Sequence, residues 1–514
     1  MLVKTYGCAI IGIQALLITI EVNIDQGIQF FMVGLPDNAV RESHQRIESA
    51  LKHNGFRIPG KKIVINMAPA DIRKEGSSYD LPIAIGILAA SEMIKTGKLE
   101  KFMIMGELSL DGSLLPVKGA LPISMEARKQ GFKGLVLPSG NAREAAVVED
   151  LQVFGAGNIK EVIDFFNGDG NLQQTTVDIR AEFGKCGGSP ALDYADVRGQ
   201  ENIKRAMEIA AAGGHNVLLI GPPGAGKTMI AKRLPSILPP LLLQEALETT
   251  KIHSVAGRLN GSGALVTTRP FRSPHHTISS VALVGGGSNP RPGEISLAHH
   301  GVLFLDELPE FSRQVLEVLR QPMEDRVVTV SRARISATYP ASFMLVAAMN
   351  PCPCGYYNHP QTPCQCNPGI IQKYLHKISG PLFDRIDIQL EVVPVPYHEL
   401  RDQSSAESSK CIRERVVIAR RKQELRFNGA KGVYCNAQMN PRQMRQFCKL
   451  NEASQQLLKN AMDKLGLSAR AYERILKVAR TIADLSDLEE IRAEFLAEAI
   501  TYRCLFYTSD AADE

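Results

Sequence analysis

The chain has 514 residues, of which 44% are hydrophobic and 22% are charged, and its formal net charge is +5. This length is too great for a single hydrophobic core, so we expect about three or four domains. The weak net charge permits a nucleic-acid partner but does not argue for one. No apolar run approaches the roughly 18 residues of a membrane span. The early run Ala9 to Ile20 is therefore predicted to form strands rather than a signal peptide.

The ten cysteines come without a recognisable export signal. Disulfides persist in oxidising compartments, so cysteines without an export signal indicate a protein of a reducing compartment, with thiols that are free or bound to metal. We therefore expect a cytoplasmic protein with no membrane partner.

Residues 1–168 are predicted to form a mixed α/β domain, because strand-like and helix-like patterns alternate along them. Strands are expected over Ile28–Val33, Lys62–Met67, Met103–Leu108, Gly134–Pro138 and Leu151–Gly155, and helices over Asp37–Asn54 and Leu81–Met93.

Two stretches of this domain, Lys74–Ser78 and Met105–Gly119, resemble the proteolytic domain of Lon-type proteases and the related domain in front of some magnesium-chelatase-like ATPases. The resemblance implies a ribosomal-S5-domain-2-like fold. A working site of this type needs a serine activated by a lysine. Ser78 lies near the nucleophile position, but the lysine position falls on Leu121, or on Ile123 if the count slips by two. Neither side chain can take a proton, so we expect an inactive scaffold or interaction domain. The alternative is an active peptidase, because Lys118 lies close to this position in the sequence.

Residues 169–192 are rich in turn-forming residues and are interpreted as a linker. The core that follows, residues 193–395, is organised around one motif. The buried strand Val217–Ile220 leads into G-x-x-x-x-G-K-T and then a helix, which is the order that a phosphate-binding loop requires. Lys227 can reach the β- and γ-phosphates of ATP, and the Thr228 hydroxyl can ligate Mg²⁺. The nucleotide-binding residues are predicted to be Gly221, Pro222, Pro223, Gly224, Ala225, Gly226, Lys227 and Thr228.

Polar side chains follow two further buried strands of the core. The strand Val302–Leu305 delivers Asp306, which would hold Mg²⁺, and Glu307, which would polarise the attacking water. The strand Phe343–Met349 ends in Asn350, whose position resembles the sensor-1 residue of AAA+ ATPases and faces the γ-phosphate or the water.

Arg385 lies on a polar turn after that strand. Its position resembles the arginine finger of AAA+ rings, which acts on the nucleotide of the neighbouring subunit. The alternative is an ordinary ion pair with Asp384 or Asp387.

Two segments resemble insertions of the magnesium-chelatase and MCM branch of AAA+ proteins. The segment Thr267–His300 precedes the Asp306 strand, and Arg326–Arg334 reads as one arm of a hairpin before the sensor strand. In that branch such insertions project into the ring pore. Arg332 and Arg334 are candidate phosphate contacts, with a solvated hairpin edge as the alternative. The pairs His275/His276 and His299/His300 lack a third metal ligand at suitable spacing and are interpreted as structural or pore-facing.

Four cysteines follow the sensor asparagine as C-x-C-x9-C-x-C. Cys352, Cys354, Cys364 and Cys366 could close a tetrahedral site for Zn²⁺, with His359 as a reserve ligand. The alternative is a loop of reduced thiols.

Residues 396–508 are predicted to form a helical lid, and residues 509–514 a tail. Residues Ile412–Asn428 are predicted to form a helix with a surplus of basic residues. The simplest explanation of the surplus is a solvent-exposed face, and the alternative is a contact with nucleic acid. Arg470 begins a later helix at a position that resembles the sensor-2 arginine of AAA+ lids. Arg474 and Arg480 are interpreted as ordinary helix charges.

Taken together, the motifs NPCPCGYY and AAAGGHNVLLIGPPGAGKTM resemble the YifB/ComM family over nearly the whole chain. The resemblance implies an ATP-driven, Mg²⁺-dependent homo-oligomer, a hexameric helicase that promotes branch migration of single-stranded or branched DNA during natural transformation. The alternatives are a chelatase-type ATPase that drives metal insertion or remodels a protein partner, and a Lon-like protease.

Overall fold

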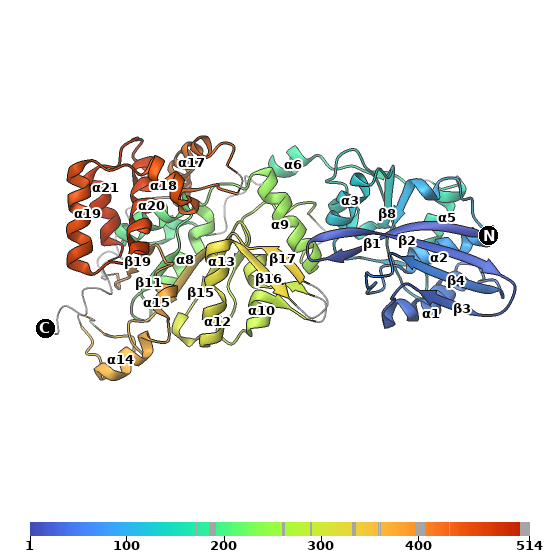
Figure 1. Cartoon of the computed structure of the whole chain (residues 1–514), viewed down its shortest axis with the longest axis horizontal. Coiled ribbons are helices and arrows are strands. Elements are labelled where there is room, and N and C mark those ends of the chain that lie inside the picture. Colours follow the sequence, from blue (N-terminus) through green and yellow to red (C-terminus); the bar gives the residue numbers. More distant parts are fainter. Residues whose placement is uncertain are drawn as a thin grey trace.

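The computed structural model describes residues 1–170, 172–184, 192–259, 263–287, 290–331, 336–357, 359, 361–395, 407–430 and 432–503. Figure 1 shows three parts in a row: an N-terminal α/β domain, a central α/β core and a helical lid at the far end. The multidomain α/β arrangement predicted from the sequence is confirmed. Within the described ranges, no helix combines the length and the apolarity that crossing a membrane would require.

The N-terminal domain is built on two four-stranded sheets, in the orders β1-β2-β4-β3 and β10-β9-β8-β5. Helix α2 (Asp80–Ala90) is apolar on every side, and each of its residues is buried. Its first residue, Asp80, accepts two hydrogen bonds from Arg46, at 2.7 and 2.9 Å, so the buried carboxylate is paired. The strands are β1 (Leu2–Ile11), β2 (Gln14–Asp25), β3 (Phe30–Val33), β4 (Lys62–Ala68), β5 (Phe102–Ile104), β8 (Gly134–Pro138), β9 (Gln152–Ala156) and β10 (Gln174–Thr175). The other helices are α1 (Asn38–His53), α3 (Ala120–Lys129), α4 (Ser139–Ala145), α5 (Ile159–Asn167) and α6 (Ile179–Gly184).

Two details of this domain differ from the sequence prediction. The strand expected over Met103–Leu108 is split into β5 and β6 (Glu107–Leu108), because the Gly106 N–H leaves the sheet to bond the Ser78 carbonyl. Strand β10 pairs with β9, so the sheet reaches beyond Gly168.

The N-terminal domain packs on the core through α3, which lies against α9 (Leu243–Ala256). Leu121 is fully buried in an apolar cluster with Leu265 of the core. The Gly119 N–H donates to the Ser254 carbonyl, and the buried Glu144 binds the Ser254 hydroxyl. Burial raises the pKa of Glu144. The position where a Lon-type lysine was sought is therefore part of a domain interface.

The core contains one five-stranded sheet of order β12-β15-β18-β11-β19, in which all neighbours are parallel. Its three inner strands are buried and apolar, as expected for a sheet covered by helices on both faces. They are β11 (Val217–Ile220), β12 (Phe271–Arg272), β15 (Val302–Leu305), β18 (Met344–Met349) and β19 (Ile388–Glu391). The helices are α7 (Glu201–Gly213), α8 (Lys227–Ile237), α9, α10 (Ser280–Val284), α11 (Glu294–Leu297), α12 (Arg313–Val318), α13 (Arg320–Asp325), α14 (Pro368–Leu375) and α15 (Gly380–Phe383).

A hairpin precedes the sensor strand, as the alternation in Arg326–Arg334 predicts. Strands β16 (Val327–Ser331) and β17 (Ser336–Pro340) pair antiparallel. The turn of the N-terminal β1–β2 hairpin approaches this hairpin, because Gly12 lies against Ala337 of β17. Arg332 and Arg334 lie outside the described residues.

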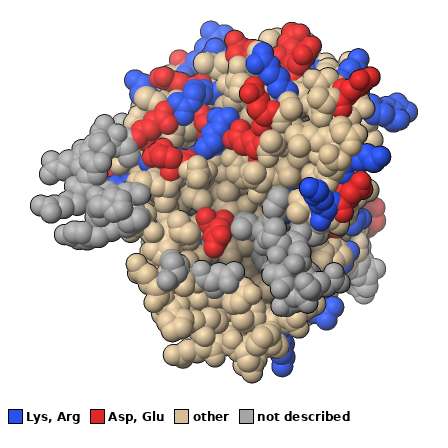
Figure 2. Space-filling view, turned by 90° about the vertical axis from the view of Figure 1, so that its left-hand side faces the viewer, with Lys and Arg blue, Asp and Glu red and all other residues tan. Residues whose placement is uncertain are grey.

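The lid is a bundle of five helices among the described residues. Two arginines of its basic helix α17 contact the core: Arg415 pairs with Glu208, and Arg420 donates to the Ala211 carbonyl at 2.9 Å. Figure 2 shows positive and negative side chains interspersed over the lid end of the molecule. Packing of the lid on the core therefore accounts for much of this basic surplus. The helices are α17 (Ser409–Arg426), α18 (Pro441–Phe447), α19 (Glu452–Leu465), α20 (Ala469–Leu485) and α21 (Ala493–Thr501).

A buried carboxylate, Asp484, ties the lid together. It accepts hydrogen bonds from Arg426, Arg480 and Asn436, and only 1% of its side chain is exposed. Arg480 is itself buried and also donates to the Leu488 carbonyl. Interpreting Arg480 as an ordinary helix charge was therefore wrong, because it neutralises a carboxylate inside the bundle.

We predict that Asp484→Asn destabilises the lid by about 3 kcal/mol, because two buried guanidinium groups lose their counter-charge. The measurement is thermal unfolding of the full chain together with hydrogen exchange of α17 and α20. The matched control is Asp487→Asn, since the Asp487 side chain is 87% exposed. Equal effects of the two substitutions would contradict this explanation.

Candidate nucleotide site

The predicted phosphate loop connects β11 to α8, at the carboxyl edge of the sheet. Gly224 and Gly226 have φ values of +80° and +87°, a conformation that side chains other than glycine rarely adopt. Gly221 has no room for a Cβ, which would lie 2.2 Å from the Val392 carbonyl oxygen. Helix α8 begins at Lys227, so its N-terminal N–H groups face the loop. The local geometry suits the binding of phosphate groups.

Lys227 points back into the loop. Its ammonium group donates to the carbonyl oxygens of Gly221 and Pro222 and to Oδ1 of Asn350, at 2.6, 2.9 and 3.0 Å. Burial lowers the pKa of Lys227. The structure thus brings the predicted sensor asparagine, which follows β18, next to the predicted phosphate-binding lysine.

Thr228 and Asp306 meet across the neighbouring strand ends, with the hydroxyl donating to the carboxylate at 2.7 Å. A hydroxyl and a carboxylate are hard oxygen donors of the kind that Mg²⁺ prefers. These residues fit the metal predicted for them, and they would hold it at the edge of the sheet where the phosphate loop lies.

Glu307 stands beside them in a left-handed backbone conformation, with φ of +53°. Its side chain is 59% exposed, and its carboxylate lies 3.3 Å from Nδ1 of His276. His276 belongs to the segment Thr267–His300, so this segment contributes a side chain next to the candidate catalytic carboxylate. The sequence offered no signal for this pairing, because 30 residues separate the two positions.

Sequence reasoning also missed Tyr374 of α14. Tyr374 is buried and lies near the backbone of Asn350, and the pKa of its hydroxyl is raised by burial and by the nearby carboxylates of Glu310 and Glu307. It adds a polar group beside Asn350.

Arg385 lies at the other edge of the sheet. Its carbonyl accepts a hydrogen bond from Asn216, the residue before β11, whereas the phosphate loop follows the last residue of β11. Its guanidinium is 6% exposed, lies 2.5 Å from Glu324 and donates to the Pro381 carbonyl at 2.6 Å.

Neither carboxylate proposed as the alternative partner of Arg385 pairs with it. Asp387 is fully buried, lies 3.2 Å from Arg474 and accepts the Asn216 N–H at 2.8 Å. The Arg474 charge and these bonds hold the pKa of Asp387 well below its usual range, against the opposing effect of burial. Interpreting Arg474 as an ordinary helix charge was therefore wrong.

Arg470 lies in the first turn of α20 and is exposed. Arg474, one turn later, contacts Asp387 at the amino end of β19. The start of α20 therefore lies by the amino edge of the sheet, on the same side as Arg385 and away from this chain's own phosphate loop.

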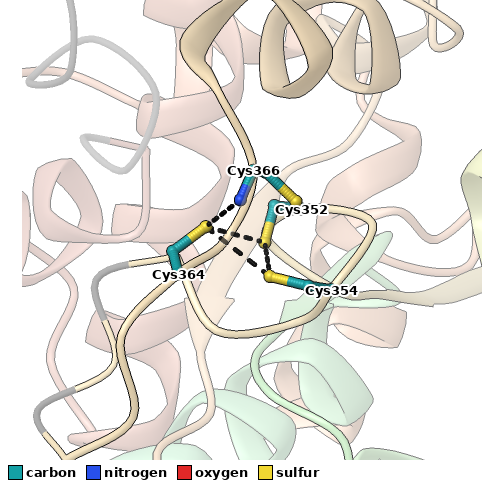
Figure 3. Close-up of side chains that lie close together, drawn as sticks. All are labelled: Cys352, Cys354, Cys364 and Cys366. Atoms are coloured by element: carbon teal, nitrogen blue, oxygen red, sulfur yellow. Dashed lines mark hydrogen bonds between the residues drawn. The ribbon is translucent and has the colours of Figure 1, made fainter.

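The four predicted zinc ligands converge in the loop between β18 and α14. Figure 3 shows their side chains facing one another. The sulfur of Cys352 lies 3.3 Å from that of Cys354 and 3.7 Å from that of Cys364, and the sulfurs of Cys354 and Cys364 are 3.6 Å apart. All four sulfurs lie within 4.8 Å of one another. A tetrahedral site with Zn–S bonds of 2.3 Å places its sulfurs about 3.8 Å apart, so the geometry fits. Backbone N–H groups of Tyr356 and Gln365 lower the pKa of Cys354 to about 6.

His359 does not fit as a reserve ligand. Its Nδ1 accepts the N–H groups of Gln361 and Thr362, at 3.2 and 3.0 Å, so the neutral ring carries its proton on Nε2.

A second group, Glu248 with His299 and His300, is also close enough to hold a metal. The Ser342 N–H donates to Nδ1 of His299 at 3.0 Å, so the proton of the neutral ring is on Nε2 and points at Glu248. Burial lowers the pKa of His299 to about 4, which keeps the ring neutral. Because Nε2 has no free lone pair, these residues do not fit a metal and are a hydrogen-bonded structural cluster.

Comparison with known families assigns the chain section by section. The profile "magnesium chelatase, subunit ChlI" matches residues 193–400, its C-terminal profile matches residues 406–503, and "subunit ChlI of Mg-chelatase" matches residues 20–141. The central match covers the sheet and the phosphate loop, and supports an ATPase role.

Full-length relatives are also found. The chain is 45% identical over 503 residues to competence protein ComM of Haemophilus influenzae, covering 97% of both chains. It is 44% identical over 503 residues to YifB of Escherichia coli, covering 97% of this chain and 96% of YifB. A distant similarity, 25% over 244 residues, links it to the DNA replication licensing factor mcm6 of Dictyostelium discoideum. The chain belongs to the YifB/ComM family of magnesium-chelatase-like AAA+ ATPases.

Proposed function

We propose that this chain is an ATP-driven DNA motor, a hexameric helicase that promotes branch migration during natural transformation. The observation that carries the proposal is the position of the arginines. Arg385 lies at the amino edge of the sheet, and Arg470 lies one helical turn before Arg474, which contacts Asp387 at that edge, whereas Lys227, Thr228 and Asp306 lie at the carboxyl edge. Strand β11 has four residues, which span about 13 Å. An arginine at the amino edge is suited to a nucleotide held by another copy of the chain.

The roles of the site residues follow from this arrangement. The phosphate loop and Lys227 bind the phosphates, Thr228 and Asp306 hold Mg²⁺, and Glu307 orients the attacking water beside Asn350. Arg385 and Arg470 of the adjacent subunit complete the site, which couples hydrolysis to movement between subunits.

The partner is proposed to be single-stranded or branched DNA. The H. influenzae relative is named a competence protein, and the distant relative is a DNA replication factor. The hairpin β16–β17 and the inserted segment are the elements proposed to meet DNA in the pore, with Arg332 and Arg334 as phosphate contacts.

The N-terminal domain is proposed to be a Lon-like scaffold without peptidase activity. Leu121 and Ile123 stand where the lysine base is needed, and both are buried in apolar clusters. The four converging cysteines are proposed to hold Zn²⁺, since they offer four sulfur ligands at suitable distances. The proposed location is the cytoplasm.

The alternative function is a chelatase-type ATPase that acts on a metal-insertion complex or another protein partner. The match of the core to chelatase subunit profiles supports it. This alternative predicts that the rate of ATP hydrolysis does not change when DNA is added.

Substitutions in the nucleotide site are expected to separate binding from hydrolysis. Lys227→Ala removes a charge-assisted hydrogen bond of about 2 kcal/mol to phosphate, so ATP binding weakens about 30-fold. Glu307→Gln retains ATP binding but lowers turnover by at least about 100-fold, because the water loses its base. Titration with a fluorescent ATP analogue and a phosphate-release assay measure the two effects. Lys232→Ala, on the exposed side of α8, and Glu310→Gln, in the turn after Glu307, are matched controls. Normal turnover by Glu307→Gln would refute its assigned role.

DNA is expected to stimulate ATP hydrolysis, and the chain is expected to unwind a labelled fork only when ATP is hydrolysed. Phosphate release is measured with and without single-stranded and forked DNA, and unwinding is followed by strand separation. The Glu307→Gln chain should bind the fork without opening it. If DNA neither binds nor changes the ATPase rate, the motor proposal fails and the chelatase-type alternative is favoured.

A further inference from the structure

The cysteine loop lies directly against the phosphate loop. Gly355, between the second and third cysteines, has a φ of +88°. A Cβ at this position would lie 2.5 Å from Cδ and 2.9 Å from Cγ of Pro223. The loop backbone therefore rests on the proline ring with no space between them, and a side chain here would displace the phosphate loop.

The same loop also borders the other side of the nucleotide site. It begins two residues after Asn350, whose Oδ1 accepts from Lys227 at 3.0 Å. It ends at α14, whose buried Tyr374 lies near the backbone of Asn350. The position of the cysteine loop thus affects Pro223 on one side and Asn350 on the other, and both lie beside the lysine predicted to bind phosphate.

Apart from the contacts of the sulfurs, the described side-chain hydrogen bonds within this loop are local ones around His359, whose ring accepts the N–H groups of Gln361 and Thr362. No helix or strand lies between Met349 and Pro368 among the described residues. Of the described residues between the first and last cysteine, only Cys352 and Gly355 are buried. The Gly355 N–H donates to the Cys352 carbonyl at 3.0 Å, so the turn that presents Gly355 to Pro223 is anchored at a candidate metal ligand. A cation bound by the four thiolates would cross-link the loop at the points that fix this turn.

We propose that a zinc ion at Cys352, Cys354, Cys364 and Cys366 shapes the phosphate loop through the Gly355–Pro223 contact, so that zinc binding and ATP binding strengthen each other. The proposal rests on the ATP-binding role of the phosphate loop and is independent of DNA. Because coupling between two ligands is reciprocal, removal of zinc should weaken ATP binding by the same factor by which removal of ATP weakens zinc binding, about tenfold.

The first test removes the metal. The full chain is purified, its zinc content is measured by elemental mass spectrometry, and the metal is stripped with a chelator that is then dialysed away. Titration of a fluorescent ATP analogue with Mg²⁺ present is expected to show about tenfold weaker binding by the stripped chain, restored by added zinc. Cys364→Ser/Cys366→Ser should lose the metal and show the same deficit, whereas Cys411→Ser, at an exposed cysteine of α17, should change neither.

The second test keeps all four ligands and changes only the contact. Gly355→Ala should retain one zinc per chain and, with cobalt in place of zinc, the absorption of a tetrahedral thiolate site, yet bind ATP about tenfold more weakly. Gly168→Ala is the matched control, because Gly168 has the same φ of +88° and no atom within 4 Å of the added Cβ. Unchanged ATP affinity in Gly355→Ala, or in the zinc-free chain, would overturn the proposal. Neither readout uses DNA, so a failure of the motor proposal remains distinguishable.

Discussion

The position of β11 inside a parallel sheet determines where the candidate site residues lie. This four-residue strand is buried between β18 and β19, and parallel pairing fixes the ends of all three strands at common edges. At the carboxyl edge, this brings Lys227, Thr228 and Asn350 together. At the amino edge, it fixes Asn216, whose N–H binds Asp387 and whose side chain binds the Arg385 carbonyl. The candidate phosphate and Mg²⁺ ligands at one edge and the arginines at the other are therefore consequences of the same strand.

Two ion pairs lie at the amino edge of the sheet. Asp387 is paired with Arg474 of the lid, and Arg385 is paired with Glu324 of α13. The lid helix α20 is thus tied to the sheet at the edge where the arginines lie. Because Arg385 is buried against Glu324, its guanidinium must exchange this partner before it can reach a phosphate of another subunit. In the ring that we propose, contact with the neighbouring subunit would supply that exchange.

The sequence predicted the parts of the site that depend on local spacing. The glycines, Lys227 and Thr228 follow a strand within one motif, and Asp306 and Asn350 each directly follow a buried strand. Because the carboxyl ends of parallel strands lie at the same edge of a sheet, these residues could be expected to lie close together. Contacts that depend on tertiary packing could not be predicted. Three such contacts are His276 with Glu307, Glu324 with Arg385 and Gly355 with Pro223. Their partners are far apart in the sequence, and neither hydrophobic periodicity nor a motif indicates that they lie together. The basic face of α17 was ambiguous for the same reason, since its partners Glu208 and Ala211 lie about 200 residues away.

The central claim is that the nucleotide site of one chain is completed by Arg385 of the adjacent chain. It is tested most directly by mixing two variants that are each expected to lose turnover, Arg385→Ala and Glu307→Gln, and measuring ATP hydrolysis. In mixed rings, the intact Glu307 of an Arg385→Ala chain can meet the intact Arg385 of a Glu307→Gln chain, so the mixture should recover activity that neither variant has alone. Full activity of Arg385→Ala by itself, or no recovery in rings shown to contain both chains, would contradict this account.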